Sequence, residues 1–181
     1  MKKLTHINQK GDAQLVDITD KAITHRKAIA EGSIKLNKET LKLIQDNLIK
    51  KGDVLNTARI AGIQAAKKTW ELIPLCHTIA LSKIDINFNI DKKNNIITCQ
   101  SSCECFAQTG LEMEALSAVS IALLTIYDMC KAVDRTMVIS NIHLVEKSGG
   151  RSGLYKRGEG LKKTKSKKDR KSTRLNSSHR T

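Results

Sequence analysis

The sequence predicts one α+β domain, in which an antiparallel sheet carries helices on one face. The chain has 181 residues, and 40% of them are hydrophobic; this is enough for the core of one domain. Residues 84–90 alternate strictly between apolar and polar side chains, and a polar turn leads to a second strand-like segment at 96–106. This pattern is typical of a β-hairpin. Residues 112–132 lack Pro and Gly and are rich in Ala, Leu and Met, so they predict a long helix.

The first third of the chain is expected to hold strands and then a short helix. Alternating or β-branched residues at 14–18 and 22–36 predict strands, with Gly32 as a candidate β-bulge. Asn37 precedes an amphipathic segment and resembles the N-cap of a helix. Lys51-Gly52-Asp53 then interrupts the helical pattern.

The remaining elements complete a mixed architecture. Small residues recur at helical spacing from 54 to 70, which predicts a helix able to pack closely, and Pro74 ends that region. After the hairpin and the long helix, residues 137–145 predict a last strand and 147–153 a glycine-rich loop. Helices and strands in this order, without an internal repeat, favour helices on one face of an antiparallel sheet.

The charge is concentrated at the C-terminal end. The formal net charge is +14, and residues 156–181 contain eleven Lys or Arg and two acidic residues, so this segment carries +9 and residues 1–155 carry +5. We therefore expect a domain at 1–155 and a disordered basic tail at 156–181. Residues 169–179 resemble the translation of a sequencing-adapter oligonucleotide, and we interpret that stretch as an assembly artefact. Nucleic-acid binding by the tail is the main rival function from another class, and the 3% aromatic content argues against base stacking.

The cysteine content and hydropathy favour a cytoplasmic protein. Five cysteines, an odd number, follow an N-terminus without an apolar secretory segment, so a disulfide framework is not expected. The longest apolar run is much shorter than the roughly 20 residues that span a bilayer. We expect neither a membrane partner nor a nucleic-acid partner.

Acidic and basic side chains share the predicted long helix. Asp128 and Lys131 are three residues apart and therefore lie on one face. They could be a solvated surface pair, or a pair with displaced pKa values in apolar surroundings that exchanges protons with a substrate. Glu112 and Glu114 open the same helix, where the helix dipole alone favours acids; the preceding Thr109-Gly110 turn could also let them contact a ligand.

Two further groups have both a structural and a functional interpretation. Cys76 and His77 follow Pro74 in an apolar stretch. His77 is either a buried structural histidine or part of a functional site. Cys99, Cys103 and Cys105 lack a paired C-x-x-C spacing and fit core thiols better than zinc ligands, so we expect no metal site.

Cations beside glycines are candidate phosphate ligands. Lys51 precedes Gly52, and Lys147 and Arg151 flank Gly149-Gly150; backbone amides and cations can hold phosphate oxygens jointly at such places. Solvated surface charge is the alternative for each. The sequence contains no G-x-x-x-x-G-K-[ST] motif, which disfavours a P-loop nucleoside triphosphatase.

Several long strings carry a resemblance to a known family. They are Lys51-Gly-Asp-Val-Leu-Asn-Thr-Ala-Arg-Ile-Ala-Gly-Ile-Gln-Ala-Ala-Lys67, Leu72-Ile-Pro-Leu-Cys-His77, Thr109-Gly-Leu-Glu-Met-Glu-Ala-Leu116 and Leu124-Thr-Ile-Tyr-Asp-Met-Cys-Lys-Ala132. The opening Leu4-Thr-His-Ile-Asn8 and the loop Lys147-Ser-Gly-Gly150 agree as well. Over about residues 2–155 the chain resembles the MoaC family of cyclic pyranopterin monophosphate synthases, which act in molybdenum cofactor (molybdopterin) biosynthesis.

The resemblance implies a reaction, a fold and an assembly. The reaction is that of a phosphorus-oxygen lyase: (8S)-3′,8-cyclo-7,8-dihydroguanosine 5′-triphosphate rearranges to cyclic pyranopterin monophosphate with release of pyrophosphate. The fold would be ferredoxin-like, assembled as a homohexamer of three dimers with sites at subunit interfaces. The resemblance implies no cofactor, and leaves open a divalent ion that accompanies the triphosphate.

The resemblance also assigns roles to residues. Asp128 would be the acid/base centre with Lys131 as its partner, and Lys51 would act in proton transfer or substrate activation. The substrate-binding residues would be Leu75, Cys76, His77, Met113 and Glu114, with Glu112 in support and Arg26, Lys147 and Arg151 facing the triphosphate.

Overall fold

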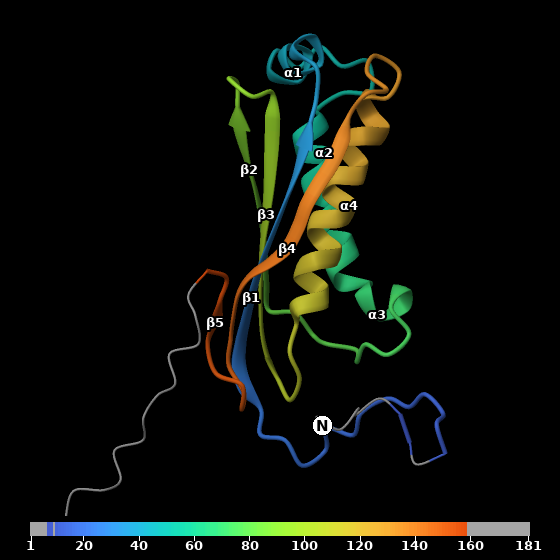
Figure 1. Cartoon of the computed structure of the whole chain (residues 1–181), viewed down its shortest axis with the longest axis vertical. Coiled ribbons are helices and arrows are strands. Elements are labelled where there is room, and N and C mark those ends of the chain that lie inside the picture. The colour runs from blue at the N-terminus through green and yellow to red at the C-terminus, as the bar shows by residue number, and fades with distance from the viewer. Residues whose placement is uncertain (1–6, 9, 159–181) are drawn as a thin grey trace, which may run out of the picture.

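The structure is a computed structural model that describes residues 7, 8 and 10–158, and Figure 1 shows a twisted sheet beside a helical layer. The elements, in chain order, are β1 (Thr24–Lys35), α1 (Lys38–Gln45), α2 (Val54–Lys67), α3 (Thr69–Leu72), β2 (Lys83–Asp91), β3 (Ile96–Ala107), α4 (Glu112–Cys130), β4 (Val138–Ser148) and β5 (Tyr155–Lys156).

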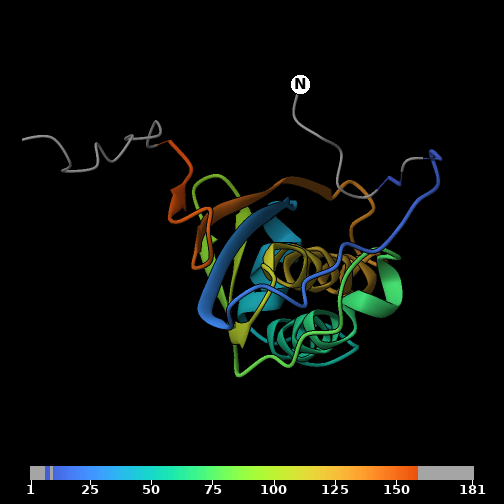
Figure 2. The ribbon, with the colours of Figure 1, turned by 90° about the horizontal axis from the view of Figure 1, so that it is seen from below.

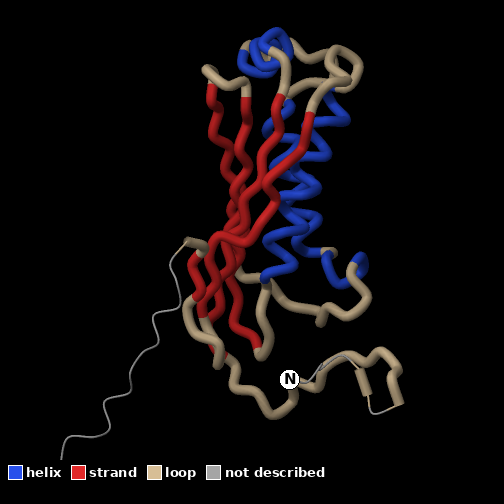
Figure 3. The backbone as a smooth tube through the Cα atoms, in the orientation of Figure 1, coloured by secondary structure: helices blue, strands red, loops and turns tan. Residues whose placement is uncertain are grey.

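All pairings within the sheet are antiparallel, and the strand order is β2-β3-β1-β4-β5. Figure 3 shows the long strands side by side, with α2 and α4 running beside them. The first four strands and their helical connections give the βαββαβ order of a ferredoxin-like fold. The predicted α+β, ferredoxin-like class is confirmed, with β5 as a short addition at the edge.

The helices cover one face of the sheet, as the view in Figure 2 makes plain. Helix α4 lies against β1, β3 and β4, and α2 packs against α4 and β2. The approach of α2 to α4 is close, since a Cβ at Gly62 would come within 2.8 Å of the Ala118 carbonyl oxygen. The small side chains of α2 therefore fit the close packing expected from the sequence.

Helix α4 is the core helix of the domain. Among the described residues it is the one helix that is long and apolar enough to cross a membrane by length and composition. Half of its apolar stretch, however, is buried inside the fold. Ala115, Ala118, Val119, Ala122 and Leu123 are fully buried. Its apolar character is explained by contact with the sheet and α2.

Three local predictions differ from the structure. Residues 14–18 form no strand, because this exposed segment has no neighbouring strand to pair with. Gly32 does lie opposite an irregularity of the β1–β4 ladder, but the additional residue is in β4, where Asn141 has a φ of 57°. The helix predicted at 54–70 is divided: α2 ends at Lys67, and the backbone N–H of Lys68 bonds back to Gln64 and Ala65.

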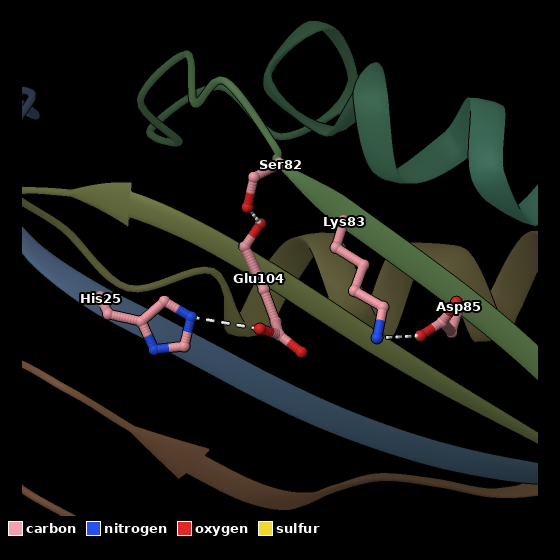
Figure 4. A network of polar contacts seen from close by, with 5 residues as sticks. All are labelled: His25, Ser82, Lys83, Asp85 and Glu104. Carbon is pink, nitrogen blue, oxygen red and sulfur yellow. Dashed lines mark hydrogen bonds and ion pairs between the residues drawn. The ribbon is translucent and has the colours of Figure 1, made fainter.

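The other face of the sheet carries a polar network, drawn in Figure 4. His25 of β1 lies 3.1 Å from the Glu104 carboxylate of β3. Ser82 donates hydrogen bonds to the Glu104 carbonyl through its backbone N–H and its hydroxyl. Lys83 and Asp85 pair along β2 at 2.9 Å. The contacts of Glu104 link β3 to β1 and to the residue before β2, while the Lys83–Asp85 pair lies within β2.

The C-terminal end of the described chain continues slightly beyond the predicted domain boundary at residue 155. Lys156 pairs with Glu146, and the Arg157 N–H donates to the Val145 carbonyl at 2.8 Å. The rest of the predicted basic tail, including 169–179, lies outside the described residues, as does the beginning of the Leu4–Asn8 string.

Candidate active site

A cleft of about 550 Å³ opens where β1 begins, β4 ends and α4 begins. Cationic side chains gather in its wall: Lys21, Arg26, Lys27, Lys147 and Arg151. The turn at Thr109-Gly110 and the Gly149-Gly150 loop supply backbone at the same place. A concave surface that combines several cations with glycine backbone is suited to an anionic group such as a polyphosphate.

Arg26 is fixed at the centre of this cleft. Its Nε donates a 2.8 Å hydrogen bond to the Ala107 carbonyl, so the guanidinium is held by its strand neighbour. The loop passes directly over it, since a Cβ at Gly149 would lie 3.1 Å from the Arg26 Cγ and would overlap the His25 carbonyl oxygen. Gly149 and Gly150 also have φ values of 95° and 72°, where a side chain is strained. Both glycines are therefore required by the geometry.

Lys147 and Glu112 form an ion pair across the cleft. The Lys147 Nζ donates to the Glu112 Oε1 at 2.6 Å, and the two side chains are 31% and 28% exposed. Gly110 makes room for the acid, because a Cβ there would come within 2.8 Å of the Glu112 Cδ. The Thr109-Gly110 turn noted in the sequence thus contributes to the site by letting Glu112 fold back.

A second cleft of about 310 Å³ adjoins the first. Four residues line both clefts: Lys21, Thr109, Gly110 and Glu112. The predicted substrate-binding residues Leu75, Cys76, His77, Met113 and Glu114 all line the smaller one. The structure thus brings these predicted substrate-binding residues together, beside the larger, cation-lined cleft.

Cys76 and His77 line the smaller cleft from the segment that follows α3. His77 Nε2 lies 2.8 Å from the Val16 carbonyl oxygen; since a carbonyl only accepts, Nε2 carries a proton and Nδ1 is left for another partner. Burial, and then the nearby Glu114, raise the pKa of the Cys76 thiol. A thiol with a raised pKa is a weak nucleophile at neutral pH, so this cysteine is suited to packing and binding.

Glu114 is the buried acid of the site. The residue is 4% exposed, and burial, reinforced by the negative charge of Glu112, raises its pKa to about 7. An acid in this range is present in both protonation states at neutral pH. Glu114 can therefore donate or accept a proton toward a ligand in the smaller cleft.

The other predicted group lies elsewhere on the chain. The Asp128 carboxylate accepts from Lys131 Nζ at 2.7 Å and from Lys51 Nζ at 2.8 Å, and Lys51 also donates to the Asp128 carbonyl at 3.0 Å. Hydrogen bonds from Lys131 and then Lys51 lower the pKa of Asp128 to about 2, and the pKa of Lys131 is raised by its bond to Asp128. All three side chains are about half exposed. The expected apolar surroundings are absent in the isolated chain.

The two groups stand at opposite ends of α4. Glu112 opens the helix and Asp128 lies two residues before its last position, which separates them by about 24 Å at 1.5 Å per residue. The chain by itself therefore joins Arg26, Lys147 and Glu112 with the smaller cleft, but does not bring Asp128, Lys131 or Lys51 to them.

Some lining residues were not predicted from the sequence. Lys21 lines both clefts and Thr24 lines the larger one, but nothing in their local pattern marks them. Among the described residues, no cluster of three or more His, Cys, Asp or Glu side chains could hold a metal ion.

A ferredoxin-like domain with a cation-lined cleft beside one lined by a buried acid is an α+β protein whose surface is suited to a small molecule that carries negative charge. Residues 15–150 match the MoaC family, and the chain belongs to that family. It is 56% identical to cyclic pyranopterin monophosphate synthase of Thermoanaerobacter pseudethanolicus over 154 residues, and these aligned residues cover 85% of this chain and 98% of the relative. A protein of the same name from Thermoanaerobacter sp. strain X514 matches with the same identity and coverage.

Proposed function

We propose that this chain converts (8S)-3′,8-cyclo-7,8-dihydroguanosine 5′-triphosphate to cyclic pyranopterin monophosphate and pyrophosphate, in molybdenum cofactor biosynthesis. The observation that carries the proposal is the pair of adjoining clefts, one lined by cations and the other by a buried acid. A substrate with a polyphosphate at one end and a purine-derived ring at the other has the matching chemistry. The names of the two relatives support cyclic pyranopterin monophosphate as the product.

In the proposed complex the triphosphate lies in the larger cleft, against Arg26, Lys147 and Arg151. Loss of pyrophosphate builds negative charge on the departing oxygens, and fixed cations stabilise that charge. The ring lies in the smaller cleft, between Leu75–His77 and Met113–Glu114. Opening and reclosing the ring moves protons to and from nitrogen and carbon, which suits a carboxyl with a pKa of about 7.

We further propose that Lys51, Asp128 and Lys131 enter the site from a second copy of the chain. The separation along α4 supports this, since one chain leaves the three far from its own clefts. An exposed Asp128 with a pKa of about 2 is a weak base. Cover by a neighbouring subunit would remove water and favour proton exchange. The assembly in this proposal is a homohexamer of three dimers.

The proposed reaction needs no redox cofactor, because the rearrangement and the loss of pyrophosphate leave the overall oxidation state unchanged. A divalent ion bound to the triphosphate would help to neutralise its charge. We place the protein in the cytoplasm; the five cysteines, all free, support a reducing compartment.

The test supplies the cyclic GTP intermediate to the full chain and measures pyrophosphate and the pterin product. Complementation tests the shared site: Asp128→Asn and Lys147→Met chains, each inactive alone, are dissociated, mixed and then allowed to reassemble. Mixed assemblies should recover up to roughly a quarter of wild-type activity, because some sites then receive both intact groups. No product from folded wild-type protein would overturn the function, and no recovery would overturn the shared site.

A further inference from the structure

The ion pair between Glu112 and Lys147 joins the two walls of the larger cleft. Lys147 belongs to β4, where it pairs with Ala28 of β1 and Tyr155 of β5, so its backbone is fixed in the sheet. Glu112 is the first residue of α4. Their 2.6 Å contact therefore connects sheet and helix in the wall of the larger cleft, through a glutamate that also lines the smaller one.

This contact competes with an anion. A phosphate group in the larger cleft is attracted to the Lys147 ammonium, but the Glu112 carboxylate already neutralises that charge and takes one of its three N–H groups. A carboxylate beside a phosphate also repels it, and more strongly where water is partly excluded. Both side chains are less than one-third exposed, so the closed pair and a bound polyphosphate oppose each other.

Release of Lys147 would have a consequence in the smaller cleft. Glu112 lines both clefts, and the smaller one is also lined by His77 and Glu114. A carboxylate that has lost its ammonium partner at a partly buried position requires a new hydrogen-bond donor. A ring N–H of the bound substrate is such a donor.

We propose that the Glu112–Lys147 pair is a latch: the polyphosphate of the substrate opens it by taking Lys147, and the freed Glu112 carboxylate then accepts a hydrogen bond from the ring in the smaller cleft. This inference rests on the proposed function for its ligand, and it makes phosphate binding and ring binding cooperative. Glu112 binds Lys147 in the free protein and accepts a hydrogen bond from the ring in the complex.

The first test measures inorganic tripolyphosphate binding to the full chain by calorimetry. Glu112→Gln should bind it roughly tenfold more tightly than wild type, because the competing charge-assisted bond is gone. In a Lys147→Met background the same substitution should tighten binding clearly less than in wild type, because only the repulsion between carboxylate and phosphate is then removed. Glu104→Gln removes a carboxylate from the opposite face of the sheet and is the control, with unchanged affinity.

The outcomes separate a latch from simple repulsion. Equal tightening by Glu112→Gln with and without Lys147 means through-space repulsion only and overturns the latch; so does wild-type protein that does not bind tripolyphosphate. Should Lys147→Met fail to fold, Lys147→Gln takes its place in the cycle. These measurements need no turnover, so an inactive protein with an intact cycle would refute the proposed function and keep the latch.

The second test follows a 2-amino-4-oxopterin by fluorescence. Tripolyphosphate should tighten pterin binding to wild type by roughly tenfold, in line with one hydrogen bond to a charged group, and should have no such effect on Glu112→Gln. Unchanged pterin affinity in wild type, or no pterin binding with or without tripolyphosphate, would overturn the release of Glu112 to the ring.

Discussion

Replacement of Glu114 by Gln should make the protein more stable at high pH. Burial raises the pKa of this carboxyl from its ordinary value of 4.5 to about 7. The folded protein therefore retains a proton that the unfolded chain has already lost, and the free energy of unfolding falls as the pH rises from about 4.5 through 7. The difference corresponds to at most about 3 kcal/mol, and to about 1–3 kcal/mol for a carboxyl that faces a cleft open to water.

Gln has nearly the same shape and no charge, so Glu114→Gln should unfold roughly 3–10 °C higher than wild type at pH 8 and at nearly the same temperature at pH 4. Thermal melts followed by circular dichroism at several pH values test this. Glu71→Gln removes an exposed acid and is the matched control, with little change at either pH. A stability difference between wild type and Glu114→Gln that stays constant from pH 5 to 8.5 would refute a raised pKa.

Three other predictions concern the rest of the site. Asp128→Asn should lower turnover by about 10²-fold or more while substrate still binds; near-normal turnover would remove Asp128 from proton transfer. Gly149→Ala should lower the free energy of unfolding by about 1–2 kcal/mol or more, because φ is 95° and a Cβ would meet Arg26; denaturant melts measure it, and an unchanged midpoint would contradict the close approach. Treatment with EDTA should leave the melting temperature unchanged, since no described side-chain cluster could hold a metal ion; a large decrease would reveal a structural metal.

The elements whose pattern is strong and local were predictable. The β2–β3 hairpin and α4 follow the alternating and helical patterns of the sequence within a few residues. Residues 14–18 have a strand-like pattern without becoming a strand, because pairing depends on a neighbour that the local sequence cannot reveal. The division after Lys67 depends on backbone hydrogen bonds, which composition does not indicate.

The site was predictable in part for the same reason. Helical spacing alone predicted the contact of Asp128 with Lys131, which the structure has at 2.7 Å. Lys51 meets the same carboxylate across 77 positions of the chain, and only the family resemblance linked the two. The apolar surroundings expected for Asp128 are not found, because burial depends on the packed structure, and the buried and exposed faces of an apolar helix look alike in a short stretch of sequence.

Helix α4 sets the distance between the two groups of site residues as well as forming part of the core. It fixes Glu112 at one end and Asp128 at the other with a rigid spacing and a fixed angle about its axis. One inserted residue in its middle would rotate the two ends by about 100° and lengthen the helix by about 1.5 Å. In an assembly whose sites each combine one end from each of two chains, such an insertion would misalign every site at once, although each end would keep its own local contacts.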